Sequence, residues 1–520
     1  MIKFGAWSVR STIIMNRRES LLYALSWPLL ASADPGAPLS SPGVTTTSQN
    51  MLRSSDLLAD AAVLRRAYET LHPGLLRYNT PEQMSAHFDA LNQALSLDQS
   101  LQQAYLAFSI FAARIRCGHT YANFFNQTTA IASALFERDN RLPVHFVWLD
   151  RRIVVTRNFS SDPAIVPGTE ILSIDDIPVA LILERLMTIA RADGQNDSKR
   201  IAWLQVTGEE PVEAFDVFLP LLFPSIGARQ RLRVRSPGAK SSRVTIVDAI
   251  TVSRRRETQP VQTDGAGPLW SLDITDPKLA VLRMPTWAMY KTRWDWQAWL
   301  QQAFDSLVRS STTALVIDLR ANEGGDDVGD VLLAHLTAKP LHLCRTRRLV
   351  RYRRVPDDLA PYLETWDPSF KDWGSSAVPF DDRFFRLARF DDEPGGKRID
   401  PRAPRYDGRV FVLTGATNSS ATFGFAQTVK QSGVATLVGQ PTGGNLRGIN
   451  GGAFFFLRLP NSRIELDLPL VGYFPVGELP PDKGVDPDIL VAHSIENIAD
   501  NVDAEMRAVR QQLLTLPEPT

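Results

Sequence analysis

The sequence contains little cysteine and carries no net charge. Cys117 and Cys344 are its two cysteines in 520 residues, too few for a disulfide framework or a zinc cluster. We expect two separate buried thiols. Lys and Arg together number 57, and Asp and Glu together also number 57. This balance argues against nucleic-acid binding because phosphate contacts need a basic excess. No cluster of metal ligands stands out, so no metal or cofactor is expected.

The N-terminal region lacks an apolar run long enough to span a bilayer comfortably. Leu21 to Ala31 is apolar and follows Arg17-Arg18, and Ala31-Ser32-Ala33 offers a small-x-small cleavage site. The pattern predicts an export signal over residues 1–33, of the general or twin-arginine type, with a mature start at Asp34. Met15 is an alternative initiator, and an N-terminal tail is the alternative structure. We expect a periplasmic or secreted protein without a stable membrane span.

Composition and periodicity divide the rest of the chain. Residues 34–50 are rich in Pro, Gly, Ser and Thr and read as a linker. Helical spacing of apolar residues predicts a helical domain over 51–135, in which Thr80 caps a helix that starts at Pro81. Short β-like segments predict a β-rich module over 136–262.

Strands and helices alternate from 263 to 500, which predicts an α/β domain, with a C-terminal helix or tail over 501–520. Val410–Thr414 and the apolar strand 314–319 are its expected buried strands, the former followed by a helix over 421–431. Ala453–Leu459 and Ile464–Leu468 read as a hairpin. Residues 345–407, rich in Arg, Asp and Pro, are expected to form a long surface excursion over the core.

Three local patterns have a chemical interpretation. Gly324-Gly325 follows a buried strand, where glycines let N–H groups point at a developing anion; a tight turn held by an Asp318–Arg320 pair is the alternative. Ser420 stands at the start of a helix after a second buried strand, a position that by itself is more typical of a helix cap. His119 lies between Gly118 and Thr120 and is a candidate base for a serine nucleophile, although a lone histidine is more often structural.

In this order the motifs resemble peptidase family S41, which includes carboxyl-terminal processing proteases, the tricorn core and the interphotoreceptor retinoid-binding protein. The resemblance covers roughly residues 55–495. It rests on Gly118-His119-Thr120, the DLRxNxGG pattern of residues 318–325, the Ser420-Ala421 pair, the GxxTxG pattern of residues 439–444 and the GVxPD pattern of residues 484–488.

The resemblance implies an α/β fold: a crotonase/ClpP-like αβ spiral core with an N-terminal helical unit and a PDZ-like β module. It implies Ser420 as nucleophile, with Ser419 as the fallback. The oxyanion hole would combine the N–H of Ala421 with that of Gly324 or Gly325. The PDZ-like module could accept an extended peptide by strand addition or be purely structural.

The positions of the lysines help to identify the general base that the resemblance implies. Processing proteases of this family use a lysine where this sequence has Asn445, and the lysines that follow Ser420 are Lys430 and Lys483. Lys430 would lie about 15 Å away along the same helix, and Lys483 is in a terminal loop. The tricorn-like branch takes its base from an N-terminal histidine, which matches His119.

The resemblance also leaves alternatives open. Glu478 is the expected orienting residue, with Asp482 as its alternative, and a solvated loop acid is possible for each. Thr422-Phe423 stands where many members carry a glutamate, which points to altered specificity or a decayed site. The expected function is an exported serine peptidase with a peptide or protein substrate. A non-catalytic protein that binds peptide or an apolar ligand on this scaffold is the alternative, and an acyl-CoA enzyme of the crotonase type is disfavoured.

Overall fold

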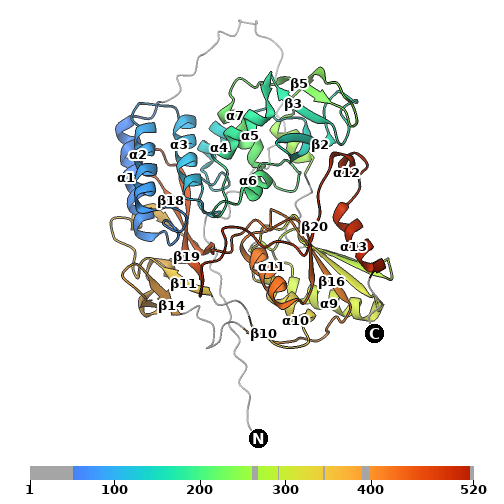
Figure 1. The fold of residues 1–520 in the computed structure, drawn as a ribbon. Helices are drawn as coiled ribbons and strands as arrows, with labels where there is room; N and C mark the ends of the chain where they lie inside the picture. Colours follow the sequence, from blue (N-terminus) through green and yellow to red (C-terminus); the bar gives the residue numbers. More distant parts are fainter. Residues whose placement is uncertain (1–50, 260–266, 291, 343–345, 389–397, 516–520) are drawn as a thin grey trace, which may run out of the picture.

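The computed structural model describes residues 51–259, 267–290, 292–342, 346–388 and 398–515. The expected export signal, the linker and Cys344 lie outside these residues. Figure 1 shows helices α1 to α3 along one side of the molecule, a β-rich unit beside them, and two further sheets below. The chain is therefore a mixed α/β protein.

The helical unit consists of α1 (Ser54–Leu71), α2 (Pro81–Ala94) and α3 (Leu101–Arg114). The side chain of Thr80 accepts from the Gln83 N–H, and the Gln83 side chain accepts from the Thr80 N–H. This reciprocal capping box, with Pro81 at the first helical position, confirms the predicted helix start. Leu57 and Leu64 recur at helical spacing and are fully buried, so α1 packs one apolar face inward.

The β-rich unit has a sheet in the order β1-β2-β3-β5-β6, with β4 paired to β3. All strand pairs of this sheet among the described residues are antiparallel. Its elements in chain order are α4 (Thr129–Phe136), β1 (Val144–Leu149), β2 (Arg152–Asn158), β3 (Glu170–Ile174), β4 (Ile177–Pro178), α5 (Val179–Met187), α6 (Asp197–Trp203), α7 (Ala214–Leu222), β5 (Arg229–Arg235), β6 (Arg243–Asp248) and α8 (Val252–Glu257). Helix α5 ends at Met187, and the residues that follow it reach the site described below.

A second sheet in the order β20-β17-β16-β9-β8-β7 forms the α/β core. Strands β8, β9, β16, β17 and β20 run parallel, and β7 is antiparallel to β8. Its elements are β7 (Ser271–Asp273), β8 (Leu279–Arg283), α9 (Trp296–Ser310), β9 (Ala314–Asp318), α10 (Val328–Leu336), β16 (Arg409–Thr414), α11 (Ser420–Ser432), β17 (Thr436–Gly439) and β20 (Ile489–Leu490). The carboxyl ends of β9 and β16, which are neighbours, therefore place the predicted glycine turn and serine turn at one edge of the sheet.

The third sheet, in the order β12-β18-β19-β11-β14-β13, corrects one expectation. Residues 345–407 do not merely cover the core, because four of their strands join the predicted hairpin of β18 (Asn450–Arg458) and β19 (Glu465–Pro475). Alternating apolar residues had marked the hairpin but not the short strands that join it. These and the remaining elements of this segment are β10 (Leu341–His342), β11 (Thr346–Val350), η2 (Ala360–Tyr362), β12 (Leu363–Glu364), η3 (Pro368–Lys371), η4 (Gly374–Ser376), β13 (Ala377–Pro379), β14 (Phe385–Leu387) and β15 (Arg398–Ile399), with β10 paired to β15.

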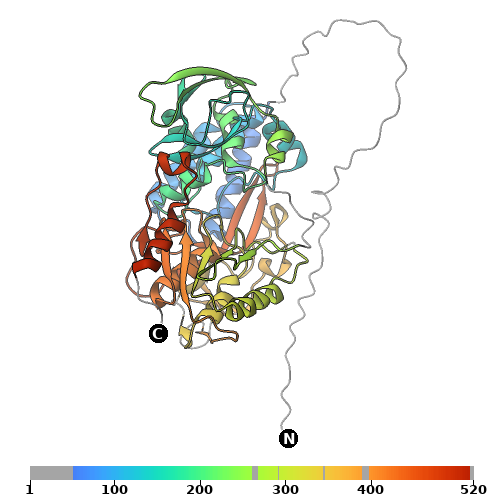
Figure 2. The same cartoon turned by 90° about the vertical axis from the view of Figure 1, so that its right-hand side faces the viewer.

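The C-terminal helices α12 (Ile495–Ala499) and α13 (Ala504–Thr515) link the β-rich unit to the parallel sheet, as Figure 2 shows. Helix α12 contacts β2, and α13 contacts β17. Arg320 at the end of β9 lies 2.9 Å from Asp503 and 3.2 Å from Glu505. It also pairs with Asp318 at 2.8 Å, so the Asp–Arg pair considered as an alternative exists and extends to the C-terminal helix.

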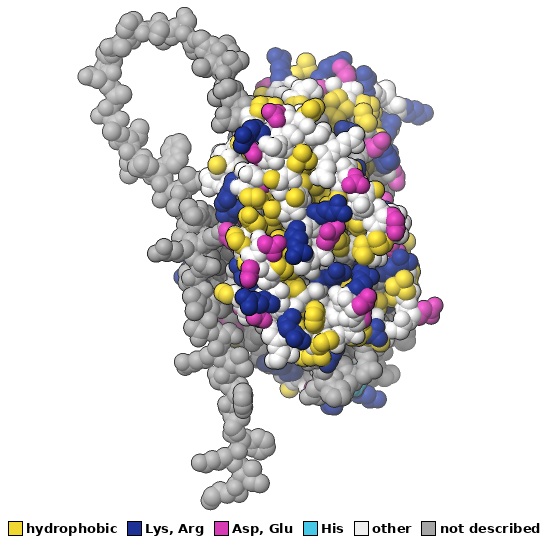
Figure 3. All heavy atoms as spheres, turned by 90° about the vertical axis from the view of Figure 1, so that its left-hand side faces the viewer, with side chains coloured by type: hydrophobic (Ala, Val, Ile, Leu, Met, Phe, Trp, Pro, Cys, Tyr) yellow, Lys and Arg dark blue, Asp and Glu magenta, His cyan; other side chains and the backbone are white. Residues whose placement is uncertain are grey.

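The surface carries charges of both signs. On the face formed by the helical unit and the third sheet, Lys and Arg side chains are interspersed with Asp, Glu and apolar groups (Figure 3). Within the described ranges, no helix combines the length and the apolar character needed to cross a membrane.

Candidate active site

Ser420 occupies a constrained position where β16 gives way to α11. Its backbone has φ +51°, a left-handed conformation that costs a non-glycine residue roughly 1–2 kcal/mol. The preceding Ser419 takes the N-cap position without capping the helix, and its hydroxyl donates instead to the Glu323 carbonyl at 3.1 Å. Ser420 makes no side-chain hydrogen bond within the described residues. The Ser419 hydroxyl is thus held by a hydrogen bond, whereas the Ser420 hydroxyl is available to react.

The glycine turn lies directly against Ser420. A Cβ added to Gly324 would stand 2.9 Å from the Ser420 Cβ and 3.1 Å from the Ala421 nitrogen. Gly324 and Gly325 have φ +120° and +139°, which favours glycine at both positions. The predicted strand ends therefore converge, and only a residue without a side chain fits between the two turns.

The backbone N–H groups of these turns differ in their partners. The Gly324 N–H donates to Asn322 Oδ1 at 2.9 Å. The N–H groups of Gly325 and Ala421 have no hydrogen-bond partner in the described part of the chain. Thr422 donates its hydroxyl to the same Asn322 oxygen at 2.8 Å. It thereby links α11 to the glycine turn.

His119 lies in a turn that is held on both sides. The Gly118 N–H donates to Asp193 Oδ1 at 3.0 Å, and Thr120 Oγ1 lies 2.8 Å from His72 Nε2. The His119 ring packs against Phe454 with centroids 5.8 Å apart. Its Nδ1 is buried without a hydrogen-bond partner, and no hydrogen bond joins the ring to Ser420 among the described residues.

Glu323 joins the histidine turn to the glycine turn through buried cations. Arg191 Nη2 lies 2.9 Å from Glu323 Oε1, and Lys199 Nζ lies 2.7 Å from the same oxygen. Arg191 also donates to the Gly118 carbonyl, next to His119. Lys199 donates to the Thr417 carbonyl at 2.9 Å, in the loop before Ser420. One carboxylate therefore connects the three segments that carry His119, Gly324 and Ser420.

The charged groups near His119 and Glu323 shift the pKa values of these two residues. Burial lowers the pKa of His119 to about 4, and the positive charges of Arg191 and Lys199 add to that effect while Glu323 opposes it. Burial alone would raise the pKa of Glu323, but Arg191 and Lys199 hold it well below its usual range. The Glu323 carboxylate is therefore ionised and the His119 ring neutral at pH 7.

Lys199, Arg191, Glu323 and Asp193 were not predicted as site residues. The first two and Asp193 lie in the β-rich unit, far from the catalytic motifs in sequence, and nothing in their local pattern distinguishes them from surface charges. Glu323 occupies the variable position directly before the two glycines. A charged residue inside a buried glycine turn was the one available signal.

Glu478 and Asp482, the acids expected to orient the His119 ring, do not bond to it. Glu478 is exposed and forms no hydrogen bond or ion pair with a described residue. Asp482 Oδ1 accepts from the Asn445 side chain at 2.7 Å and from the Gln195 N–H at 3.0 Å. Neither carboxylate bonds to His119. Asn445 is fully buried and also donates to the Asp193 carbonyl at 3.1 Å, so the position that carries lysine in processing proteases links two units here.

The lysines beyond Ser420 pair with acids on the surface. Lys430 pairs with Asp488, and Lys483 pairs with Asp486. The lysine that does approach the serine turn is Lys199, which is tied to Glu323. Burial lowers its pKa, while the ion pair favours its charged form.

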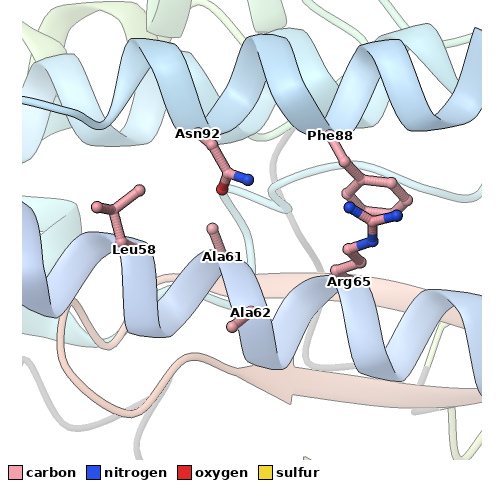
Figure 4. Close-up of a pocket in the computed structure, with 6 residues that line it drawn as sticks. All are labelled: Leu58, Ala61, Ala62, Arg65, Phe88 and Asn92. Atoms are coloured by element: carbon pink, nitrogen blue, oxygen red, sulfur yellow. The ribbon is translucent and has the colours of Figure 1, made fainter.

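A cavity of about 290 Å³ lies apart from these turns, between α1 and α2. Figure 4 shows four of its side chains on α1 and two on α2. Arg65 reaches across this cavity and lies over the Phe88 ring at 5.0 Å. No residue of the serine, glycine or histidine turns lines it, so it belongs to the packing of the helical unit.

Comparisons with known proteins give two results for the sequence. Residues 278–491 match the family model described as peptidase family S41. The segment includes both the glycine turn and the serine turn. A search of the curated proteins finds no match to the sequence.

Several solved structures share the fold. Mature CPAF complexed with lactacystin has 17% sequence identity and a TM-score of 0.59, and the alignment covers 89% of this chain and 98% of that chain. Mature CPAF alone has the same identity and TM-score, with 89% and 97% covered. A CPAF mutant has 16% identity and a TM-score of 0.59, with 90% and 99% covered. At such identities the likeness shows a common fold, and it extends well beyond the segment that matches the family model.

The class defined by the matched segment and its serine turn is a serine-type peptidase. Residues 278–491 carry the match to peptidase family S41, and the resemblance inferred from the motifs is confirmed.

Proposed function

We propose that the protein hydrolyses peptide bonds by acyl transfer, with Ser420 as nucleophile and His119 as general base. The observation that carries this proposal is the close packing of Gly324 against Ser420. A Cβ added to Gly324 would lie 2.9 Å from the Ser420 Cβ. A carbonyl carbon bound beside Ser420 would have its oxygen near the N–H groups at the glycine turn and the start of α11. The peptide or protein nature of the substrate follows from the family.

In the proposed reaction, Ser420 Oγ attacks the peptide carbonyl and passes its proton to a nitrogen of His119. The oxyanion accepts hydrogen bonds from the Ala421 N–H and from the glycine turn, where Gly325 is preferred to Gly324 because the latter already donates to Asn322. The protonated His119 then protonates the leaving amine. Water hydrolyses the acyl-enzyme with His119 again as base.

The His119 ring must form a hydrogen bond to Ser420 Oγ in the substrate complex. Hydrogen bonds at catalytic sites often tighten only once substrate is bound. Glu478 is proposed to orient the ring when the loop that carries it closes, and Asp482 is the alternative. Arg191 and the Glu323 carboxylate limit the movement required, because they already join the histidine turn to the glycine turn.

The proposed architecture is a crotonase/ClpP-like spiral core over residues 263–500, a PDZ-like module over 136–262 and a helical domain over 51–135. Parallel strands β9 and β16, which share a hydrophobic core with α10 and α11, support the first assignment. The five-strand path of β1 to β6 supports the second. We propose export to the periplasm or the exterior from the N-terminal signal pattern alone.

Hydrolysis of a mixed peptide library, followed by mass spectrometry, tests this function. The wild type should generate new termini, Ser420→Ala should generate none, and Ser419→Ala should retain measurable turnover. Peptide binding without any hydrolysis by the wild type would favour the alternative of a non-catalytic binding protein.

A further inference from the structure

A row of aromatic side chains leads from His119 toward solvent. The Phe454 ring centroid lies 5.8 Å from that of His119. Trp366 lies 5.8 Å from Phe454 and 5.9 Å from Phe456. Trp366 is 53% exposed, and both phenylalanines are half-buried. A partly exposed group of adjoining aromatic rings marks a binding site more often than a scattered apolar residue does.

The alternation of β18 explains how the row is built. Ala453, Phe455 and Leu457 are fully buried and face the core, so the side chains between them project to the opposite face. Trp366 follows the short strand β12, which pairs with β18 through Leu363↔Leu457 and Glu364↔Phe456. The segment expected to be a surface excursion thus supplies the outermost ring of the row.

The edge of β18 beside this row has no strand partner near His119. Strand β12 pairs with β18 at residues 456 and 457, Trp366 just beyond it lies against Phe454, and none of the described residues pairs with that edge from Gly451 to Ala453. Gly452 is exposed and has φ +71°. A Cβ on Gly451 would lie 4.0 Å from His119 Cε1 and Nε2, so this stretch runs directly past the candidate base.

An extended peptide added to this edge would continue the line of β12. Its alternate side chains would project on the same face as Phe454 and Phe456, about 5 Å from their cross-strand neighbours. A large apolar side chain would then be covered by Trp366. A charged side chain would lose water on that face without gaining a partner.

We propose that Trp366, Phe454 and Phe456 form a subsite for a large apolar side chain of the substrate peptide, bound as an added strand on the edge of β18. The inference rests on the proposed function, since it takes His119 as the base that acts beside the subsite. It specifies the substrate class as peptides with an aromatic or branched aliphatic residue near the scissile bond.

Cleavage of a mixed peptide library measures this preference. The wild type should cleave near large apolar residues, and Trp366→Ala should lower kcat/KM for a peptide that carries one of them by roughly tenfold, because the variant covers less of that side chain. Phe456→Ala should act in the same direction. For a matched peptide that carries a polar residue instead, kcat/KM should change little. Unchanged cleavage preferences in both variants would overturn the subsite.

Phe380→Ala is the matched control, because Phe380 is 43% exposed on the same segment but lies against Arg347 rather than β18. It should leave the preference intact. A comparable loss of preference in this control would contradict a role specific to the row.

Binding to the Ser420→Ala variant separates this proposal from the proposed function. Fluorescence anisotropy with a labelled library peptide and its Phe-to-Ser counterpart should show about tenfold tighter binding of the former, and Trp366→Ala should abolish the difference. Such binding without hydrolysis by the wild type would support the subsite and refute the peptidase mechanism. Equal binding of both peptides would refute the subsite even where hydrolysis is observed.

Discussion

Lys199 and Glu323 join two units of the molecule at the candidate active site. Lys199 lies on α6 of the β-rich unit, Glu323 lies in the glycine turn of the α/β core, and Nζ is 2.7 Å from Oε1. The Lys199 side chain is only 4% exposed, so this contact is shielded from bulk water. The position of the glycine turn therefore depends on how the β-rich unit docks.

Loss of the Glu323 charge should weaken this docking. Glu323→Gln leaves the cations of Lys199 and Arg191 without a carboxylate, and breaking a buried pair typically costs about 3–5 kcal/mol. Because glutamine keeps an acceptor and Glu323 is partly exposed, we expect the free energy of unfolding in urea to fall by about 2–3 kcal/mol. The rate of covalent labelling of Ser420 should fall at least about tenfold, which is about 1.4 kcal/mol in the barrier.

Glu257→Gln is the control for this change, because Glu257 pairs with Arg254 on the surface with both side chains more than half exposed. It should change stability by less than about 0.5 kcal/mol. Normal stability and labelling in Glu323→Gln would show that the buried charges do not position the turn.

The pH dependence of hydrolysis should reflect the lowered pKa of His119. A general base acts in its neutral form, and burial lowers the pKa of this ring to about 4. The neutral form therefore persists as the solution is acidified, and kcat/KM should fall only as the pH passes through about 4. Glu323→Gln removes the charge that opposes this shift, so its acidic limb should move to still lower pH. An acidic limb near 6.5, the ordinary value for imidazole, would contradict this account.

We expect that no side chain is tolerated at position 324, because Gly324 lies against Ser420. Gly324→Ala would place a methyl group 2.9 Å from both the Ser419 carbonyl oxygen and the Ser420 Cβ, so the two turns must separate. We expect peptide hydrolysis to fall at least about 100-fold, since even a small misplacement of reacting groups has that effect.

Gly424→Ala provides the matched control on α11. Gly424 is exposed, and nothing lies within 4 Å of a Cβ added there. The change should leave hydrolysis intact and raise helix stability by up to about 1 kcal/mol. Equal loss in both glycine variants would mean that the space beside Ser420 is not the cause.

Arg320 should anchor the C-terminal helix rather than act on substrate. It pairs with Asp318, Asp503 and the nearly buried Glu505. Arg320→Ala should therefore expose α13 to limited proteolysis and lower the free energy of unfolding by about 3 kcal/mol. Arg510→Ala, which breaks an exposed pair with Asp276, should cost less than about 1 kcal/mol. Similar proteolysis of the two variants would contradict the anchoring role.

The family and the main strands could be predicted because they depend on local signals. Thr80, Gln83 and Pro81 encode a helix start within four residues, and the apolar run ending at Ile317 encodes a buried strand. The convergence of Gly324 and Ser420 followed from a general rule, because adjacent parallel strands end at the same edge of their sheet.

The remaining features depend on contacts between distant segments. Arg191 and Lys199 resemble ordinary surface charges until the fold brings them to Glu323. The strands between 345 and 387 are only two to five residues long, too short for alternation to be recognised. Of these strands, β12 pairs with β18 and β11 pairs with β19, and the others pair in turn with β11 or β14. Nothing in the local sequence of Trp366 places it on the same face as Phe454.

The account rests on Ser420 as the reacting group, and covalent labelling with a fluorophosphonate probe tests that claim most directly. The wild type should be labelled on the tryptic peptide that contains Ser420, His119→Ala should be labelled at least about 100-fold more slowly, and Ser420→Ala should not be labelled at all. Labelling that persists in Ser420→Ala, or that disappears in Ser419→Ala instead, would contradict the assignment.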